Sequence, residues 1–243
     1  MATGDDDFWA KFLGINPSDW NLSGVEIRAH VGLTGYTGIW CFRRRDLTVV
    51  SAPDGWVSHL RNRIGSGDAN RLLDESFLRN LLGEDFERLI GPAFQGCLEP
   101  AAFRHASAKE VRPLLQEDDA AYDRLRADCG PEVVGVSGLL KSTERVGYFR
   151  ASMLLAVAGY RPWTDFAGDP CILTHPGHQG RGYGTAVASA VMRRALNEGK
   201  LLLYQTLEAN TGAVHIARKL GYEQYARHVA VRLRNDSPTL GDK

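Results

Sequence analysis

The chain has 243 residues, of which 44% are hydrophobic, so it can bury the core of one large domain or of two small ones. Lysine plus arginine and aspartate plus glutamate number 29 each, and the formal net charge is therefore zero. Without a basic excess the sequence has no electrostatic footprint for a nucleic acid or an acidic membrane surface, and we expect neither as a partner.

The cysteines and the N-terminus bear on compartment and metal binding. Cys41, Cys97, Cys129 and Cys171 are far apart and form no C-x-x-C pair, and no histidine stands at a zinc-ligand interval from them. We therefore expect no metal site and four reduced thiols. Residues 1–7 are acidic where a signal peptide would be basic, and no apolar run approaches the roughly 18 residues that a membrane span needs. These features predict a cytoplasmic protein.

The first part of the chain, residues 1–105, predicts a small α/β domain of unknown role. Residues 25–31 alternate between apolar and polar, and residues 39–50 form a hairpin with a solvated basic tip around Arg43-Arg44-Arg45. Helical patterns follow, and strand character returns over residues 88–94. We place the domain boundary near residues 100–107, where Glu99-Pro100 and a run of small residues interrupt the pattern.

The second part, residues 106–243, alternates between strands and helices. Its glycine-rich stretch from Gly130 to Arg145 predicts an irregular, mobile substrate loop. The expected strands and helices are a strand over 111–115, a helix opened by Glu117, strands over 148–160 and 171–174, a helix over 185–196, a strand over 201–207, a helix over 213–220 and a last strand over 225–233.

A glycine loop lies between the strand 171–174 and the helix that follows. It reads Gln179-Gly180-Arg181-Gly182-Tyr183-Gly184. Glycines let the backbone approach a ligand closely, and the first N–H groups of a helix have no partner within it, so the arrangement predicts an anion site. The glycine spacing matches neither the dinucleotide fingerprint nor the P-loop. A tight strand-to-helix turn would use the same glycines, and for the loop alone this alternative stays open.

The pattern Q-x-x-G-x-G resembles the acetyl-CoA loop of the GCN5-related N-acetyltransferase (GNAT) family. Downstream, Asn210, Ala213, Ile216, Gly221 and Tyr222 stand at the matching places of that family's N-x-x-A-x-x-L-Y-x-x-x-G-F motif. The two motifs in this order extend the resemblance over about residues 108–233. It implies a GNAT-like mixed, largely antiparallel sheet flanked by helices, beside the smaller N-terminal α/β domain.

The resemblance also implies roles at the site. The loop amides would bind the coenzyme A pyrophosphate, the strand 172–174 would pair with the pantetheine arm and supply an oxyanion donor, and Asn210 would hydrogen-bond the arm. Arg181 would either add charge near a phosphate or face solvent. The expected cofactor-binding residues are Ile172, Leu173, Thr174, Gln179, Gly180, Arg181, Gly182, Tyr183, Gly184, Thr185 and Asn210.

The catalytic side departs from the family pattern. The family often has a tyrosine seven residues after the asparagine, where its hydroxyl can protonate the leaving thiolate, but here that residue is Ala217. His215 lies about 200° around the helix from position 217, and we expect it to face away from the cofactor. Asp169 and Glu208 are the candidate general bases, directly or through water, although a solvated or structural carboxylate is the more common role for such a residue.

The sequence therefore predicts an acetyl-CoA-dependent N-acetyltransferase whose acceptor is a small-molecule or peptide amine. The acceptor contacts are expected from variable loops such as residues 130–147 or from the N-terminal domain. Tyr160 and Trp163 either line the acceptor pocket or, as we expect, pack in the core or at the rim. Two alternatives stay open. One is a non-catalytic acyl-CoA-binding sensor or regulatory module, and the other is a loop that binds a different nucleotide.

Overall fold

The computed structural model describes residues 3–234, and these divide into two compact units. Unit 1 consists of the described residues up to Gln95, the segment Thr206–Ala209 and the described residues from Gln224 onward, whereas unit 2 consists of Gly96–Gln205 and Asn210–Glu223. The expected single boundary near residues 100–107 is thus replaced by an interleaved division. Residues 235–243 of the predicted second domain lie outside the described part of the chain.

Unit 1 is built on a six-stranded sheet with the order β1-β3-β2-β11-β4-β10. Strand β1 runs parallel to β3, whereas β2 runs antiparallel to both β3 and β11. The elements are α1 (Thr3–Leu13), β1 (Gly24–Ala29), β2 (Ile39–Arg44), β3 (Leu47–Ala52), α2 (Asp54–Arg61), α3 (Glu75–Leu82), β4 (Phe86–Cys97), β10 (Tyr204–Leu207) and β11 (Glu223–Leu233).

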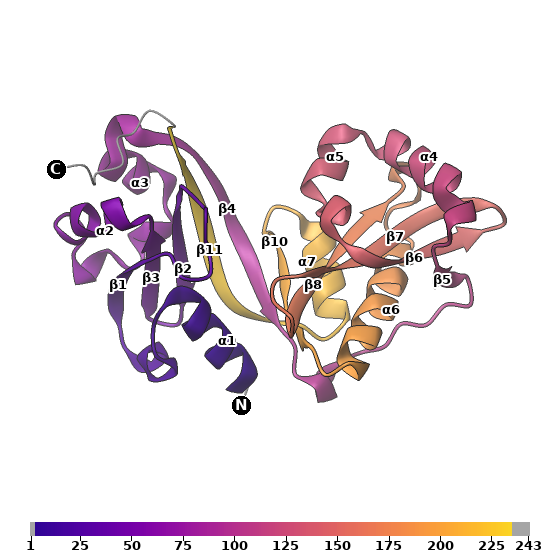
Figure 1. The fold of residues 1–243 in the computed structure, drawn as a ribbon, viewed down its shortest axis with the longest axis horizontal. Helices are drawn as coiled ribbons and strands as arrows, with labels where there is room; N and C mark the ends of the chain where they lie inside the picture. Colours follow the sequence, from indigo (N-terminus) through magenta and orange to yellow (C-terminus); the bar gives the residue numbers. More distant parts are fainter. Residues whose placement is uncertain (1–2, 235–243) are drawn as a thin grey trace. The chain divides into compact units, whose positions relative to one another are not determined.

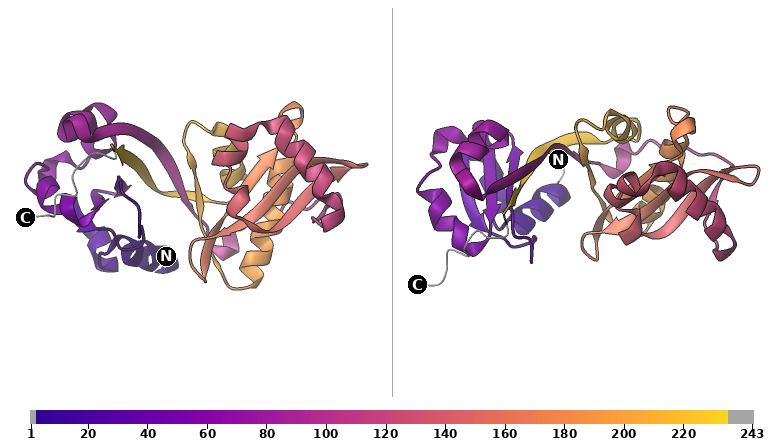
Figure 2. Two further views of the ribbon diagram at one scale, coloured as in Figure 1. Left: turned by 45° about the horizontal axis from the view of Figure 1, so that its top comes forward. Right: turned by 90° about the horizontal axis from the view of Figure 1, so that it is seen from above.

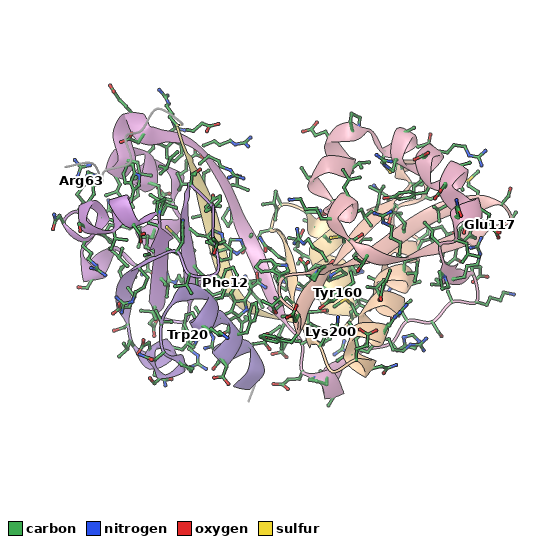
Figure 3. The ribbon with its side chains drawn as sticks, in the orientation of Figure 1. Phe12, Trp20, Arg63, Glu117, Tyr160 and Lys200 are labelled. Carbon is green, nitrogen blue, oxygen red and sulfur yellow. The ribbon has the colours of Figure 1, made fainter. Side chains whose placement is uncertain are left out.

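Alternate residues of β2 face two different cores in unit 1. Ile39 and Cys41 belong to an apolar cluster with α2 and α3, whereas Phe42 stacks on Trp9 of α1 with ring centroids 4.8 Å apart. Figure 3 labels Phe12 and Trp20, which belong to the aromatic side chains on the α1 side.

One arginine of the predicted basic tip is part of this packing. Arg44 is buried, pairs with Asp6 at 2.6 Å and lies 4.2 Å from the Tyr225 ring centroid. The expectation of a fully solvated tip is therefore wrong for Arg44.

Unit 2 is built on a five-stranded sheet with the order β5-β6-β7-β8-β9. Strands β5 to β8 are antiparallel neighbours, and only β9 runs parallel to β8. The predicted mixed, largely antiparallel sheet flanked by helices is confirmed. The elements are β5 (Val111–Pro113), α4 (Asp119–Cys129), α5 (Pro131–Val136), β6 (Thr143–Arg150), β7 (Met153–Pro162), β8 (Ala167–Thr174), α6 (Tyr183–Asn197), β9 (Leu201–Leu202) and α7 (Thr211–Lys219).

Helices cover both faces of this sheet (Figures 1 and 2). Cys171 and Leu173 of β8 pack into an apolar cluster with side chains of α4 and α5. The alternate residues Ile172 and Thr174 face α6, where both contact the position of a Cβ at Gly184. This alternation places the two faces of β8 against different helices. None of the described helices has the length and apolar character that crossing a bilayer requires.

The last strand, β11, does not join the sheet of the second predicted domain. It pairs antiparallel with β2, from Arg227 opposite Arg43 to Val231 opposite Ile39, and it belongs to unit 1 from Gln224 onward. Its alternate residues Val229, Val231 and Leu233 complete the apolar cluster of α2 and α3. Our placement of residues 225–233 in the second domain was wrong, because the apolar face of this strand is buried in the core of unit 1.

Packing in unit 2 explains why the motif that begins at Asn210 has a glycine at position 221. Gly221 follows α7 with φ of 100°, and a Cβ there would lie 2.2 Å from the backbone oxygen of Ala102. The neighbouring Leu220 carbonyl accepts a hydrogen bond from the Arg104 N–H at 3.0 Å. Only glycine allows this close approach.

We expect Gly221→Ala to lower the free energy of unfolding by about 2–4 kcal/mol, because it combines a positive φ with a backbone clash. Gly199→Ala is the control, since Gly199 also has a positive φ, of 72°, but no atom within 4 Å of an added Cβ. It should cost about 1 kcal/mol. Urea denaturation of the two variants measures the difference, and equal losses would contradict the packing argument.

Candidate active site

Strand β8 is paired with β7 on one edge. On the other edge, which we call its outer edge, a neighbouring strand covers only part of its length. Strand β8 pairs with β7 from Gly168 to Thr174, but β9 pairs with it only at Ala167 and Gly168. The His175 N–H donates to Leu155 of β7 at 2.9 Å, and the Gly168 oxygen accepts from the Leu203 N–H at 2.9 Å. Beyond Gly168, the outer edge of β8 has no strand partner in the described part of unit 2.

The alternation of the backbone shows which groups lie at this open edge. Backbone groups of every second residue point to the same side of a strand, so Gly168, Ile172 and Thr174 direct theirs away from β7. Pro170 lies in the same row but has no N–H. Ile172 is therefore the first residue beyond Gly168 that offers a backbone donor at the open edge.

The glycine loop follows β8 directly, after a 3-10 turn over Pro176–His178. Gly180 and Gly182 have φ values of 74° and 82°, and an added Cβ at either would meet no atom within 4 Å. Their backbone conformation, and not a lack of space, requires glycine. Gly184 differs, because a Cβ there would lie 3.0 Å from Thr174 Oγ1 and 3.1 Å from Ile216 Cδ1.

Helix α6 begins at the end of this loop without a side-chain cap. Gly182 is its N-cap, and the first backbone bond runs from the Ala186 N–H to the Gly182 oxygen at 3.0 Å. The N–H groups of the first turn are thus available, and the macrodipole of this 15-residue helix favours an anion in front of them.

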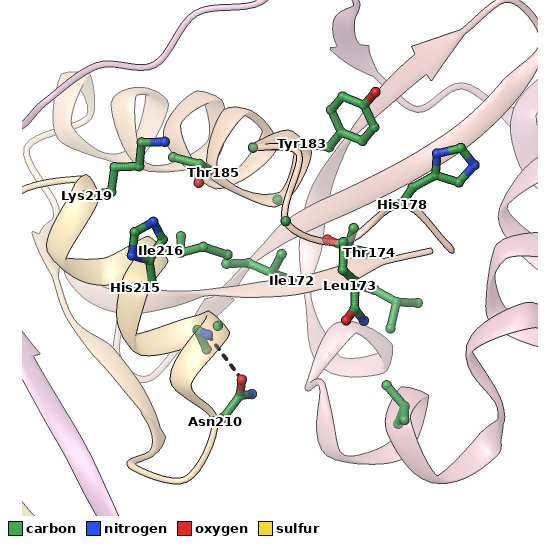
Figure 4. A pocket seen from close by; sticks show the side chains of 17 residues that line it. Ile172, Leu173, Thr174, His178, Tyr183, Thr185, Asn210, His215, Ile216 and Lys219 are labelled. Carbon is green, nitrogen blue, oxygen red and sulfur yellow. Dashed lines mark hydrogen bonds between the residues drawn. The ribbon is translucent and has the colours of Figure 1, made fainter. Parts of the chain in front are cut away.

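The open edge, the glycine loop and α7 enclose a cavity of about 350 Å³ (Figure 4). Ten of the eleven expected cofactor-binding residues line it, and Arg181 does not. The residues that our sequence analysis did not place at the site are Val133, His178, Gly212, Ala213, His215, Ile216 and Lys219. The helical spacing of residues 212, 215, 216 and 219 could have indicated a common face, but not which way it points.

Asn210 is the N-cap of α7. Its side-chain oxygen accepts a hydrogen bond from the Ala213 N–H at 3.1 Å (Figure 4). The cap satisfies one of the free donors of the first helical turn. Because the oxygen is occupied, the side-chain NH2 group is the part of Asn210 that can donate to a ligand.

The face of α7 that lines the cavity is not the one we expected. His215 and Lys219, four residues apart, both line the cavity, whereas Ala217 is completely buried and does not. The angle of about 200° between positions 215 and 217 holds, but it is Ala217 that faces the core. His215, which we expected to face away from the cofactor, therefore lines the cavity, and the missing tyrosine position is not part of the cavity wall.

Asp169, the first candidate base, is buried in an ion pair. Arg161 donates to both of its carboxylate oxygens at 2.9 and 2.6 Å, and Trp163 Nε1 donates at 3.2 Å. Burial raises the pKa of Asp169, against the lowering effect of Arg161. Asp169 does not line the cavity, and its two oxygens are already occupied. The structure thus gives it a structural environment in place of the expected catalytic one.

Glu208, the second candidate base, lies in unit 1 and forms a bidentate ion pair with Arg227 at 2.6 and 2.7 Å. It does not line the cavity either.

Tyr160 and Trp163, the candidates for either the acceptor pocket or core packing, are also absent from the cavity wall. Tyr160 is buried, with Lys200 Nζ 5.1 Å from its ring centroid (Figure 3), and Trp163 bonds Asp169.

Among the described residues that line the cavity, the titratable groups are histidines, a lysine and a tyrosine. Partial burial lowers the pKa of His178, with further lowering from Arg181 and His175. His178 is therefore neutral at physiological pH and able to accept a proton.

We expect Ala217→Tyr to be destabilising by at least about 1–3 kcal/mol, because the new ring would enter a filled core. It should not increase turnover. Arg218→Tyr, at an exposed position of the same helix, is the matched control and should change stability by less than about 0.5 kcal/mol. Thermal unfolding and thiol-release assays test both variants. A stable Ala217→Tyr protein with faster turnover would place position 217 at the reacting thioester.

Arg161→Met should lower the free energy of unfolding by about 3–5 kcal/mol at pH 7, because it leaves the Asp169 carboxylate buried and unpaired. Removing the arginine raises the pKa of Asp169 further, so the folded variant binds more protons than the unfolded chain. Stability then rises as pH falls, and the loss should be smaller at pH 5. Arg194→Met, in an exposed pair with Glu198, should change stability by less than about 1 kcal/mol. Urea denaturation at both pH values checks this, and a pH-independent loss would count against it.

Comparison with known proteins identifies part of the chain. Residues 146–231 match the family model described as FR47-like protein, and no curated protein matches. Among solved structures, an acetyltransferase from the GNAT family of Colwellia psychrerythraea is 15% identical with a TM-score of 0.49, covering 65% of this chain and 61% of that one. A GCN5-related N-acetyltransferase from Kribbella flavida is 18% identical with a TM-score of 0.46, covering 65% and 66%.

A third structure, yncA from Salmonella typhimurium with its cofactor acetyl-CoA, is 16% identical with a TM-score of 0.39, covering 52% of this chain and 94% of that one. The chain spans 61% and 66% of the Colwellia and Kribbella proteins, which is less than two thirds of each. These structural likenesses are distant. The family match is the stronger finding: residues 146–231 match an FR47-like, GNAT-related family model, so that the family resemblance of the glycine loop and the Asn210 motif is confirmed over this part of the chain.

Proposed function

We propose that this protein transfers an acetyl group from acetyl-CoA to the amine of an acceptor. The observation that carries the proposal is the continuity of the open edge of β8 with the glycine loop and the uncapped N-terminus of α6 within one cavity. A strand edge binds amide-containing chains, and a helix N-terminus binds phosphate. Coenzyme A combines a diamide arm with a pyrophosphate in that order. The family of residues 146–231 supports the same conclusion.

The backbone would hold the cofactor along its length. The amides of the loop and of the first turn of α6 bind the pyrophosphate, and the edge groups of Ile172 and Thr174 pair with the arm. The NH2 group of Asn210 donates to an arm carbonyl. A cavity of about 350 Å³ is within the usual range of roughly 300–1,000 Å³ for ligand pockets.

We assign the stabilisation of the oxyanion to the backbone N–H of Ile172. Its N–H is the first donor along the open edge beyond Gly168, because Pro170 lacks one. As the amine attacks the thioester carbonyl, the carbonyl oxygen gains negative charge, and a fixed backbone donor stabilises it. The amine nitrogen forms the new amide bond as the carbon–sulfur bond breaks, and the coenzyme A thiolate takes up the proton that the amine loses, through the protein or through water, so that it leaves as the thiol. Of the described lining residues, His178 and His215 are able to accept the amine proton.

A second candidate function is a non-catalytic acyl-CoA-binding module. The observation that favours it is that neither Asp169 nor Glu208 lines the cavity and that Ala217 replaces the family's tyrosine. Both functions share the cofactor site and differ only in turnover. Incubation with acetyl-CoA and a panel of primary amines, followed by detection of released thiol, separates them. Binding of acetyl-CoA without thiol release on a broad panel would favour the module.

We expect Gly182→Asp to weaken coenzyme A binding at least about 100-fold, because the carboxylate would stand at the site of the pyrophosphate. The matched control is Gly199→Asp, because Gly199 also has a positive φ, of 72° against 82° at Gly182, and open surroundings, but lies beyond the end of α6. Its affinity should equal that of the wild type. Isothermal titration calorimetry measures both, and unchanged affinity of the Gly182 variant would mean that the loop is only a turn. Tighter binding of ATP or NAD than of coenzyme A would contradict the assignment of coenzyme A as the ligand of this loop.

A further inference from the structure

The stretch expected to be an irregular substrate loop contains the short helix α5 and a 3-10 turn over Leu139–Lys141. Three large apolar side chains of this segment are exposed, with accessible fractions of 50% for Val133, 82% for Val136 and 57% for Leu140. We call these three residues the α5 surface. Single exposed apolar residues are common, whereas apolar side chains that gather in one patch are typical of an interaction site.

The segment that carries the α5 surface runs beside β8. At its start, Cys129 Sγ donates to the Thr174 oxygen at 3.7 Å. In its middle, Val134 belongs to the same apolar cluster as Leu173. At its far end, a Cβ on Gly138 would lie 2.6 Å from Cys171 Sγ. The segment therefore follows β8 backwards, from the end at the glycine loop towards the end at which we place the thioester (Figure 1).

The α5 surface is continuous with the cavity. Val133 belongs to both, since it lines the cavity and is half exposed. Val136 follows it at a spacing of three, which places the two side chains on one side of the helix. No aspartate or glutamate is among the described residues that line the cavity. A polyhydroxylated acceptor would thus lose water from its hydroxyl groups against valine and leucine. The exposed Glu132, next to Val133 in α5, is the nearest carboxylate of this segment in the sequence.

We propose that the acceptor is a primary amine with an apolar group beside the amine, and that this group covers Val136 and Leu140 while the amine reaches the thioester. This inference rests on the acyl-transfer function proposed above and names its substrate class. The gain comes from the apolar area that both partners remove from water.

The test compares two primary amines, 2-phenylethylamine and ethanolamine, with acetyl-CoA as the donor and thiol release as the readout. We expect kcat/KM for 2-phenylethylamine to exceed that for ethanolamine at least about tenfold in the wild type. Val136→Ser and Leu140→Ser should each reduce this preference about fivefold, with an unchanged KM for acetyl-CoA. Both positions are exposed, so the fold should tolerate serine. Met153→Ser, at a position 54% exposed outside the α5 surface, is the control and should leave the preference unchanged.

Equal or higher kcat/KM for ethanolamine, or a preference that both serine variants retain, would overturn the proposal. A serine variant that changes only the affinity for acetyl-CoA would assign the α5 surface to the cofactor. One that changes only the sedimentation of the protein would assign it to a second copy of the chain. Either result excludes the apolar acceptor.

Failure of the proposed function gives a different result. If acetyl-CoA binds but no amine releases thiol, the transfer proposal fails. Calorimetric titration of 2-phenylethylamine into the coenzyme A-saturated protein then tests whether the α5 surface binds an apolar amine. Binding that weakens about fivefold in Val136→Ser and Leu140→Ser supports the apolar site. No binding, or binding that neither variant weakens, excludes it.

Discussion

Strand β8 is paired from Gly168 to Thr174 on one edge and only at Ala167 and Gly168 on the other, and the candidate site depends on this asymmetry. Backbone N–H and C=O groups that are buried without a partner cost free energy, so an open edge is stable only where water or a ligand reaches it. The cavity gives that access to Ile172 and Thr174. The same edge ends in the glycine loop, which brings the free amides of α6 into line with it.

Small residues make this arrangement compact, for two separate reasons. Gly180 and Gly182 adopt positive φ angles, so that the chain turns sharply between β8 and α6. Gly184 allows α6 to approach both Thr174 of β8 and Ile216 of α7. Together these glycines place the positive end of the α6 dipole at the mouth of the cavity. The spacing G-x-G-x-G thus reflects one turn followed by one helix contact.

No carboxylate is found among the described residues that line the cavity. Asp169 is buried against Arg161, and Glu208 is paired with Arg227. The wall instead carries His178, His215 and Lys219, with backbone donors between them. The polar groups that this wall offers a ligand are therefore fixed backbone donors and a few side chains, none of which is a carboxylate.

Local patterns in the sequence determined the strand–loop–helix unit, the class of the fold and ten of the eleven expected lining residues, because glycine spacing, caps and periodicity are properties of neighbouring residues. Asn210 shows this well, since its capping bond to Ala213 spans only three positions. Tertiary structure alone decided that β11 completes the sheet of unit 1, that His215 and not Ala217 faces the cavity, and that Asp169 is buried in an ion pair. Each of these outcomes is set by partners distant in the sequence. Periodicity defines the faces of a helix or strand, but only its packing partners determine which face becomes the core and which becomes the site.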